Sequence, residues 1–186
     1  MRRILPLSAA IGTCSLLIAA APHGWGLAGS RPTAYDTGVD PVVLYAGAPS
    51  AFLRSKENPV KGFGTLMQSI AADDYRGKRI RFSGYVRADQ VKEGAGLWMR
   101  VDKERESVAF DNMQNRPIKG TSDWLQYAVV LDVPSDATGI FFGILLTETG
   151  TVWLSGVKFE VVGTDVPTTS SSTGSRVPVN LDFALP

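Results

Sequence analysis

The chain has 186 residues and a formal net charge of +1 at pH 7, with 44% hydrophobic and 20% charged residues. This length and composition are ordinary for one soluble globular domain with a sizeable core. The near-zero net charge argues against the strongly basic surface typical of nucleic-acid-binding proteins, so we expect no nucleic-acid partner.

The N-terminus has the pattern of a secretory signal peptide. Arg2 and Arg3 precede an apolar run over residues 4–21, and small residues follow up to Ala28. The pattern predicts a signal peptide over residues 1–28 that is cleaved after Ala28, and export to the periplasm or the medium. Cleavage after Ala21 is less favourable because it would place Pro22 next to the cut. A retained anchor is the alternative, since the run nearly reaches the ~18–20 apolar residues that span a bilayer.

The predicted cleavage removes the single Cys and the single His of the chain, Cys14 and His23. It also leaves 17 of the 19 basic residues against 18 acidic ones, a formal charge of −1. A mature chain of this kind has no disulfide, no thiol nucleophile, no Ser-His-Asp triad and no zinc held by His or Cys. We therefore expect no metal and no cofactor, and no stable insertion in the membrane after cleavage.

The remaining sequence consists of short apolar runs that are separated by Gly, Pro, Asn and Asp. After an extended lead-in over 29–40, the expected strands cover 42–46, 50–55, 64–70, 78–88, 96–102, 107–111, 124–133, 139–147 and 151–162. No long segment has helical periodicity. The pattern predicts an all-β, two-sheet antiparallel jelly-roll sandwich over 41–163 as a single domain.

Two segments stand out in this series. The run 139–147 is apolar on both faces, which is typical of a central strand that is covered on both sides. Residues 164–186 form a Thr/Ser-rich linker and a C-terminal tail, "VPVNLDFALP". The tail is apolar enough to dock as an edge strand, or to add a strand to a protein partner.

The order of these runs resembles jelly-roll carbohydrate-binding modules and related galactose-binding-like sandwiches. It is similar in particular to bacterial sandwich domains that occur as stand-alone exported proteins or fused to AraC-type regulators. The resemblance covers about Val42 to Val162, and the phrase from Trp124 to Leu154 resembles the last strands of such modules. The chain departs from the regulators because it has no recognisable DNA-binding helices. The resemblance implies a fold more specifically than a ligand.

One candidate binding surface follows from strand alternation. Trp98, Arg100 and Asp102 share one face of their strand, and we expect Tyr85 and Arg81 to face the same way on a neighbouring strand. An aromatic ring covers the C–H face of a sugar, and charged groups bind adjacent hydroxyls. The alternative is that Trp98 is a core residue and that Arg100 and Asp102 form a surface ion pair.

A polar loop follows this strand and supplies further candidates, namely Asp111, Asn112, Asn115 and Arg116. One interpretation is a ligand-contacting loop in which Arg116 clamps the ligand. A calcium site is the second interpretation, although the spacing matches no EF-hand loop. The third is a network of Asx turns that holds a strand crossover.

These patterns lead to a predicted function with two alternatives. We expect an exported, non-catalytic module that binds carbohydrate or a similar polyhydroxylated ligand. The first alternative is a protein-interaction sandwich with no small-molecule ligand. The second is a carboxylate-based glycan hydrolase built on Asp102 and Asp111, which requires the two carboxyl groups ~5–10 Å apart.

Overall fold

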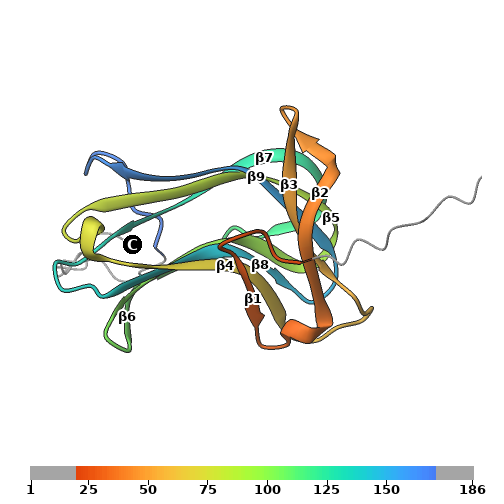
Figure 1. Cartoon of the computed structure of the whole chain (residues 1–186), viewed down its shortest axis with the longest axis horizontal. Coiled ribbons are helices and arrows are strands. Elements are labelled where there is room, and N and C mark those ends of the chain that lie inside the picture. The colour runs from red at the N-terminus through yellow and green to blue at the C-terminus, as the bar shows by residue number, and fades with distance from the viewer. Residues whose placement is uncertain (1–19, 171–186) are drawn as a thin grey trace, which may run out of the picture.

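The computed structural model describes residues 20–170, which form an antiparallel all-β domain (Figure 1). Two short 3₁₀ turns, η1 (Pro32–Ala34) and η2 (Asp73–Tyr75), are the only helical elements in this part of the chain. The strands are β1 (Gly26–Gly29), β2 (Tyr35–Tyr45), β3 (Ala48–Ser55), β4 (Phe63–Ala71), β5 (Arg79–Lys103), β6 (Glu106–Asp111), β7 (Ile118–Asp132), β8 (Gly139–Thr147) and β9 (Thr151–Val162).

The strands form one curled sheet that folds into the two layers of a sandwich. The order is β1-β4-β8-β5-β9-β3-β2, and β6 and β7 also pair with β5. The first half of β5 pairs with β7 and β9, and its second half pairs with β8 and β6. Figure 1 shows β7 and β9 in one layer and β4 and β8 in the other. The two sheets expected from the sequence are therefore joined by a shared strand.

The 25-residue strand β5 changes layer through a run of register shifts between Val86 and Ala95. Gln90 within this run has a positive φ of 51°, which marks a local backbone distortion. Before it the even-numbered Val86 points into the core, and after it the odd-numbered Leu97 does so. The sequence indicated two separate strands here, 78–88 and 96–102, and the structure joins them.

The core lies between the two layers. Side chains that are at most 1% exposed include Ile80 and Phe82 on β5, Leu66 on β4 and Ile144 on β8. Phe142 and Phe159 pack with their ring centroids 4.6 Å apart and link the layers through aromatic contact. The inward positions of Ile80, Phe82 and Val86 are those that period-two alternation gives to the expected strand over 78–88.

The domain begins earlier than the sequence predicted. β1 pairs with β4 from Gly26↔Met67 to Gly29↔Gly64, although this segment overlaps the expected signal peptide. Trp25 packs edge-on against Phe142 with the ring centroids 6.1 Å apart. The expected lead-in also contains most of β2. Residues 1–19 lie outside the described residues, and cleavage of a signal peptide remains a prediction.

At the other end, the first part of the expected linker lies against the sandwich. Thr169 accepts a hydrogen bond from the Val130 amide at 2.8 Å through its hydroxyl, and its own amide donates to the Val130 carbonyl at 2.9 Å. Arg79 donates to the carbonyl oxygens of Thr164 and Val166. The tail "VPVNLDFALP" lies outside the described residues. Between residues 20 and 170, no helix is long and apolar enough to cross a membrane.

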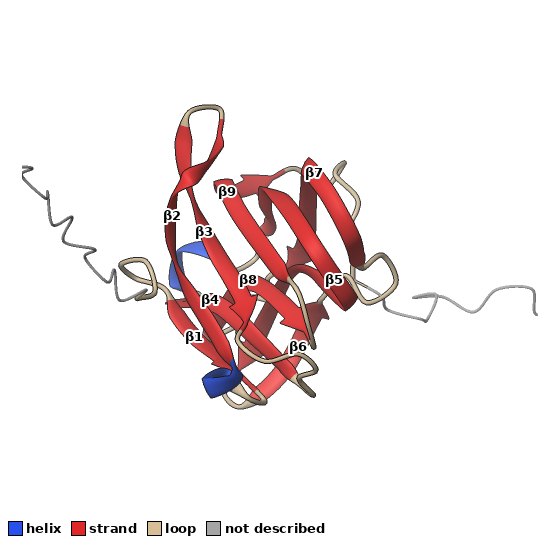
Figure 2. Cartoon of the chain, turned by 90° about the vertical axis from the view of Figure 1, so that its right-hand side faces the viewer, coloured by secondary structure: helices blue, strands red, loops and turns tan. Residues whose placement is uncertain are grey.

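The β2–β3 hairpin extends past the end of β9, as Figure 2 shows. Asp40 holds a bend in this hairpin because its carboxylate accepts bonds from the Val42 and Val43 amides and from the indole N–H of Trp153. The bend brings Tyr45 onto Tyr85 of β5. The hairpin therefore covers part of the outer face of the β9 layer.

Candidate functional site

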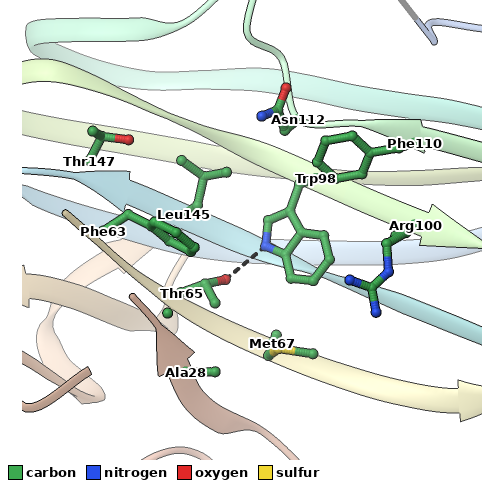
Figure 3. Close-up of a pocket in the computed structure, with 11 residues that line it drawn as sticks. Ala28, Phe63, Thr65, Met67, Trp98, Arg100, Phe110, Asn112, Leu145 and Thr147 are labelled. Atoms are coloured by element: carbon green, nitrogen blue, oxygen red, sulfur yellow. Dashed lines mark hydrogen bonds between the residues drawn. The ribbon is translucent and has the colours of Figure 1, made fainter. Parts of the chain in front are cut away.

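A groove of about 400 Å³ lies on the outer face of the layer that contains β1, β4, β8, β5 and β6 (Figure 3). Its lining combines aromatic and aliphatic side chains with a few polar ones. The lining residues are Ala28, Gly29, Phe63, Thr65, Met67, Trp98, Arg100, Phe110, Asn112, Leu145 and Thr147.

Trp98 forms the floor of the groove. It is 8% exposed, yet it lies on the face opposite to Leu97 and Met99 and outside the core cluster. It is paired with Gly143 on β8, which has no side chain, and its indole N–H donates to the Thr65 hydroxyl on β4 at 2.7 Å. The indole thus lies across β8, attached to β5 at one end and hydrogen-bonded to β4 at the other. Trp98 lies outside the core cluster, and its ring is not fully exposed.

Two phenylalanines stand above this floor on different strands. Phe63 begins β4 and is 39% exposed, and Phe110 on β6 is 45% exposed. Figure 3 shows Trp98 between them, with Met67 and Leu145 completing the apolar surface. Exposed aromatic side chains beside a groove are the groups that most often carry contacts to a ligand.

Arg100 lies at one end of the groove and is tied to Asp102. Its Nε lies 2.8 Å from Asp102 Oδ1, and its second terminal nitrogen donates to Oδ2 at 2.9 Å. The guanidinium also lies over the ring of Phe141, 4.6 Å from the centroid. In the β5–β6 register, Phe110 is paired with Arg100 on the side opposite to Phe141. The predicted ion pair is present, and it is packed between aromatic rings.

The loop after β6 is held by hydrogen bonds within itself. Asp111, whose side chain is fully buried, accepts from the Met113 amide at 2.8 Å and pairs with Arg116 at 2.6 Å. Asn112 accepts from the Gln114 amide at 3.2 Å. The structure therefore shows the Asx-turn network that was one of the three interpretations of this loop.

Of the loop residues, only Asn112 lines the groove. Asn115 accepts a hydrogen bond from Arg116 at 3.0 Å, and Arg116 also donates to the Ala128 carbonyl of β7. Asp111 and Arg116 thus connect the two layers at one end of the sandwich. They stabilise the loop that carries Asn112 and do not themselves face the groove.

Asp102 and Asp111 do not form the carboxylate pair that a glycosidase requires. Asp111 is opposite Met99 in the β5–β6 register and shares its inward face, whereas Asp102 shares the outward face of Trp98. Each carboxylate is also paired with its own arginine. The geometry therefore gives no support to a hydrolase built on these two residues.

Tyr85 and Arg81 lie on a different surface from Trp98, and the predicted common face is wrong. All of these residues belong to β5, but the register shifts in its middle place the first half in the other layer. Arg81 pairs there with Glu160 at 3.0 Å. Tyr85 stacks on Tyr45 with centroids 4.1 Å apart, and the hydrogen bond that the Tyr45 hydroxyl donates to Tyr85 raises the pKa of Tyr45 to about 12.

The sequence patterns did not indicate the apolar part of the groove, in particular Phe63, Phe110, Met67 and Leu145. The run 139–147 carried a signal, because Phe141 and Leu145 make its outer face apolar. β8 is indeed central, between β4 and β5. Its outer face, however, forms the groove and is not covered by a further layer. Across residues 20–170, no group of three or more His, Cys, Asp or Glu side chains is placed to hold a metal ion.

The fold is that of the β-sandwiches related to carbohydrate-binding modules. The CBM22-1 xylan-binding domain of Xyn10C from Paenibacillus barcinonensis superposes with a TM-score of 0.56 and 14% identity, covering 79% of this chain and 91% of that domain. The Stig cyclase Fisc from Fischerella, solved with a 3H-indole compound, gives 0.55 and 13%, covering 77% and 87%. At these identities the likeness is one of fold alone.

In sequence, the chain is similar to the uncharacterized HTH-type transcriptional regulator YbfP of Bacillus subtilis (strain 168). The two are 42% identical over 165 residues, which cover 86% of this chain and 56% of the regulator. The chain therefore spans about half the length of this relative. No family model matches the chain. The sequence resemblance to regulator-fused sandwich domains agrees with this similarity.

Proposed function

We propose that the protein is a non-catalytic module that binds a glycan in the groove over Trp98. The observation that carries this proposal is the indole floor between the exposed rings of Phe63 and Phe110. Aromatic rings pack on the apolar C–H face of a sugar ring. Asn112 and Thr147 near one end of the groove and Arg100 at the other supply polar groups for hydroxyls.

The fold supports the same function, because a xylan-binding domain has this architecture. We also infer that the module acts outside the cytoplasm, because residues 2–21 have the pattern of a signal peptide. In a protein such as the similar regulator, a sandwich of this kind would serve as the part that senses a ligand.

A glycan array followed by titration calorimetry tests the proposal on the wild-type protein and on Phe110→Ala. We expect dissociation constants on the order of micromolar to millimolar, because the groove is open. Phe110→Ala should weaken binding about tenfold or more, since removal of one large aromatic contact costs roughly 1.5–3 kcal/mol. Leu125→Ala is the matched control, because Leu125 is 53% exposed and lies on β7, outside the groove.

A second candidate function is protein binding through the outer face of the β9 layer. Tyr45, Tyr85 and Trp124 cluster there, and Arg87 lies over the ring of Trp153. Tyr, Trp and Arg are enriched in the centres of protein interfaces. An array without any bound glycan, together with a stoichiometric protein partner that is lost in Trp124→Ala, would favour this function.

A further inference from the structure

The composition of the groove limits the ligands that it can accept. Between its ends, the surface consists of Phe63, Phe110, Trp98, Met67 and Leu145 (Figure 3). A sugar with hydroxyl groups all around its ring would place some of them against this apolar surface. A buried hydroxyl without a hydrogen-bond partner lowers affinity.

The polar groups on the floor are already bonded within the protein. The indole N–H of Trp98 donates to Thr65, and the Thr65 hydroxyl donates to the Ile144 carbonyl at 2.9 Å. Neither the Trp98 indole N–H nor the Thr65 hydroxyl therefore needs a hydrogen bond from a ligand. The lining side-chain groups left for hydrogen bonds with a ligand are the Asn112 amide N–H, the Thr147 hydroxyl and the terminal Arg100 nitrogen that does not contact Asp102.

The charge of the groove is also balanced. Arg100 is the cationic residue among those that line it, and both of its contacts to Asp102 are shorter than 3 Å. Asp102 is 8% exposed and cannot easily turn away into water. An anionic ligand would gain little from Arg100, because it would have to compete with a carboxylate that is already in place.

We propose that the groove selects uncharged glycosides that carry a flat apolar group, and that Asp102 sets this selectivity by occupying Arg100. The proposal rests on the glycan-binding function above and names its ligand class. The flat group lies on the apolar surface between Phe63 and Phe110, and the sugar reaches Asn112 and Thr147. Asp102 acts through Arg100 and is a specificity-determining residue.

Four probes separate the parts of this proposal in titrations of the wild-type protein. They are methyl β-D-glucopyranoside, phenyl β-D-glucopyranoside, phenyl β-D-glucuronide and benzyl alcohol. We expect the phenyl glucoside to bind at least about tenfold more tightly than the methyl glucoside, because one buried ring contributes that much or more. The glucuronide should bind no more tightly than the phenyl glucoside.

Two variants assign these effects to residues. Phe110→Ala should remove the preference for phenyl over methyl, and Leu125→Ala should leave it unchanged. Asp102→Asn frees Arg100 and should improve binding of the glucuronide about fivefold, as expected for one partly exposed charge pair. The gain is read as the ratio of the affinity for the glucuronide to the affinity for the phenyl glucoside in the same variant. Circular dichroism checks that each variant is folded.

Each contrary result has a distinct meaning. Equal affinities for the methyl and phenyl glucosides would overturn the inference and leave the glycan-binding function in place. Tighter wild-type binding of the glucuronide, or no gain in Asp102→Asn, would overturn the role of Asp102. Benzyl alcohol that binds as tightly as the phenyl glucoside would show that the sugar contributes nothing, and the proposed function would fail. Binding of none of the four probes would overturn the inference.

Discussion

The hydrogen bond between the Trp98 indole and the Thr65 hydroxyl allows a quantitative test of how the groove floor is built. Thr65→Val removes the acceptor and leaves a donor within the floor without its partner, which should cost about 1–3 kcal/mol. Trp98→Phe removes the donor and part of the ring, at a cost of about 1–3 kcal/mol. Thr65 retains its bond to Ile144 in that variant.

The double variant should be less destabilised than the sum of the two single variants. Once the indole N–H is absent, the Thr65→Val substitution no longer leaves an unsatisfied donor, so we expect a coupling free energy of about 1 kcal/mol. Urea unfolding followed by circular dichroism measures all four proteins. Thr147→Val is the control in the same groove, and its effect should stay within about 0.5 kcal/mol. Strictly additive effects of the two single variants would refute this account of the floor.

Three further predictions concern other parts of the molecule. Asp111→Ala should cost about 2–4 kcal/mol in urea unfolding because it breaks a buried ion pair, whereas loss of the exposed Arg54–Asp36 pair should cost less than about 1 kcal/mol. Folding raises the pKa of Tyr45 from 10.0 to about 12, so the interaction of its neutral hydroxyl stabilises the folded state fully below pH 10. Stability should therefore fall as the pH rises from 10 towards 12, and less so in Tyr45→Phe; identical pH profiles would contradict this. A chain that begins at Ser30 lacks β1 and should melt about 5 °C or more below one that begins at residue 20; equal melting temperatures would show that β1 contributes nothing.

Much of the fold was predictable because strand alternation is a local property. The inward positions of Ile80 and Phe82 follow from period two, and the Arg100–Asp102 pair follows from the same rule. The pairing of strands was not predictable in this way. Tyr85 and Trp98 were expected on neighbouring strands of one face, but they lie on a single strand that changes layer. Gln90 has a positive φ in this strand, and a glutamine in the sequence does not indicate such a backbone distortion.

The candidate site was only partly predictable for a related reason. Trp98, Arg100 and Asn112 were recognised by residue type, and all three line the groove. Phe63 comes from a strand that is distant in sequence from Trp98, and only the sheet order brings it to the groove. Phe110 lies opposite Arg100 in the β5–β6 hairpin, so its place depends on the register of that hairpin. β1 was hidden because the same small and apolar residues are typical of a signal peptide and of an edge strand.

The position of β5 in both layers has a consequence for the order in which the chain folds. The β2–β3 hairpin joins the rest of the sheet through β9, the last strand among residues 20–170, because Ala51 to Arg54 pair with Thr151 to Leu154. The first half of β5 also pairs with β9, far along the chain. Such pairings between distant segments slow folding, because closing the long loop between them costs chain entropy before the contacts form. The β2–β3 hairpin can therefore pair with the rest of the sheet only after β9 has been synthesised. We expect the two layers to form and unfold together as one cooperative unit.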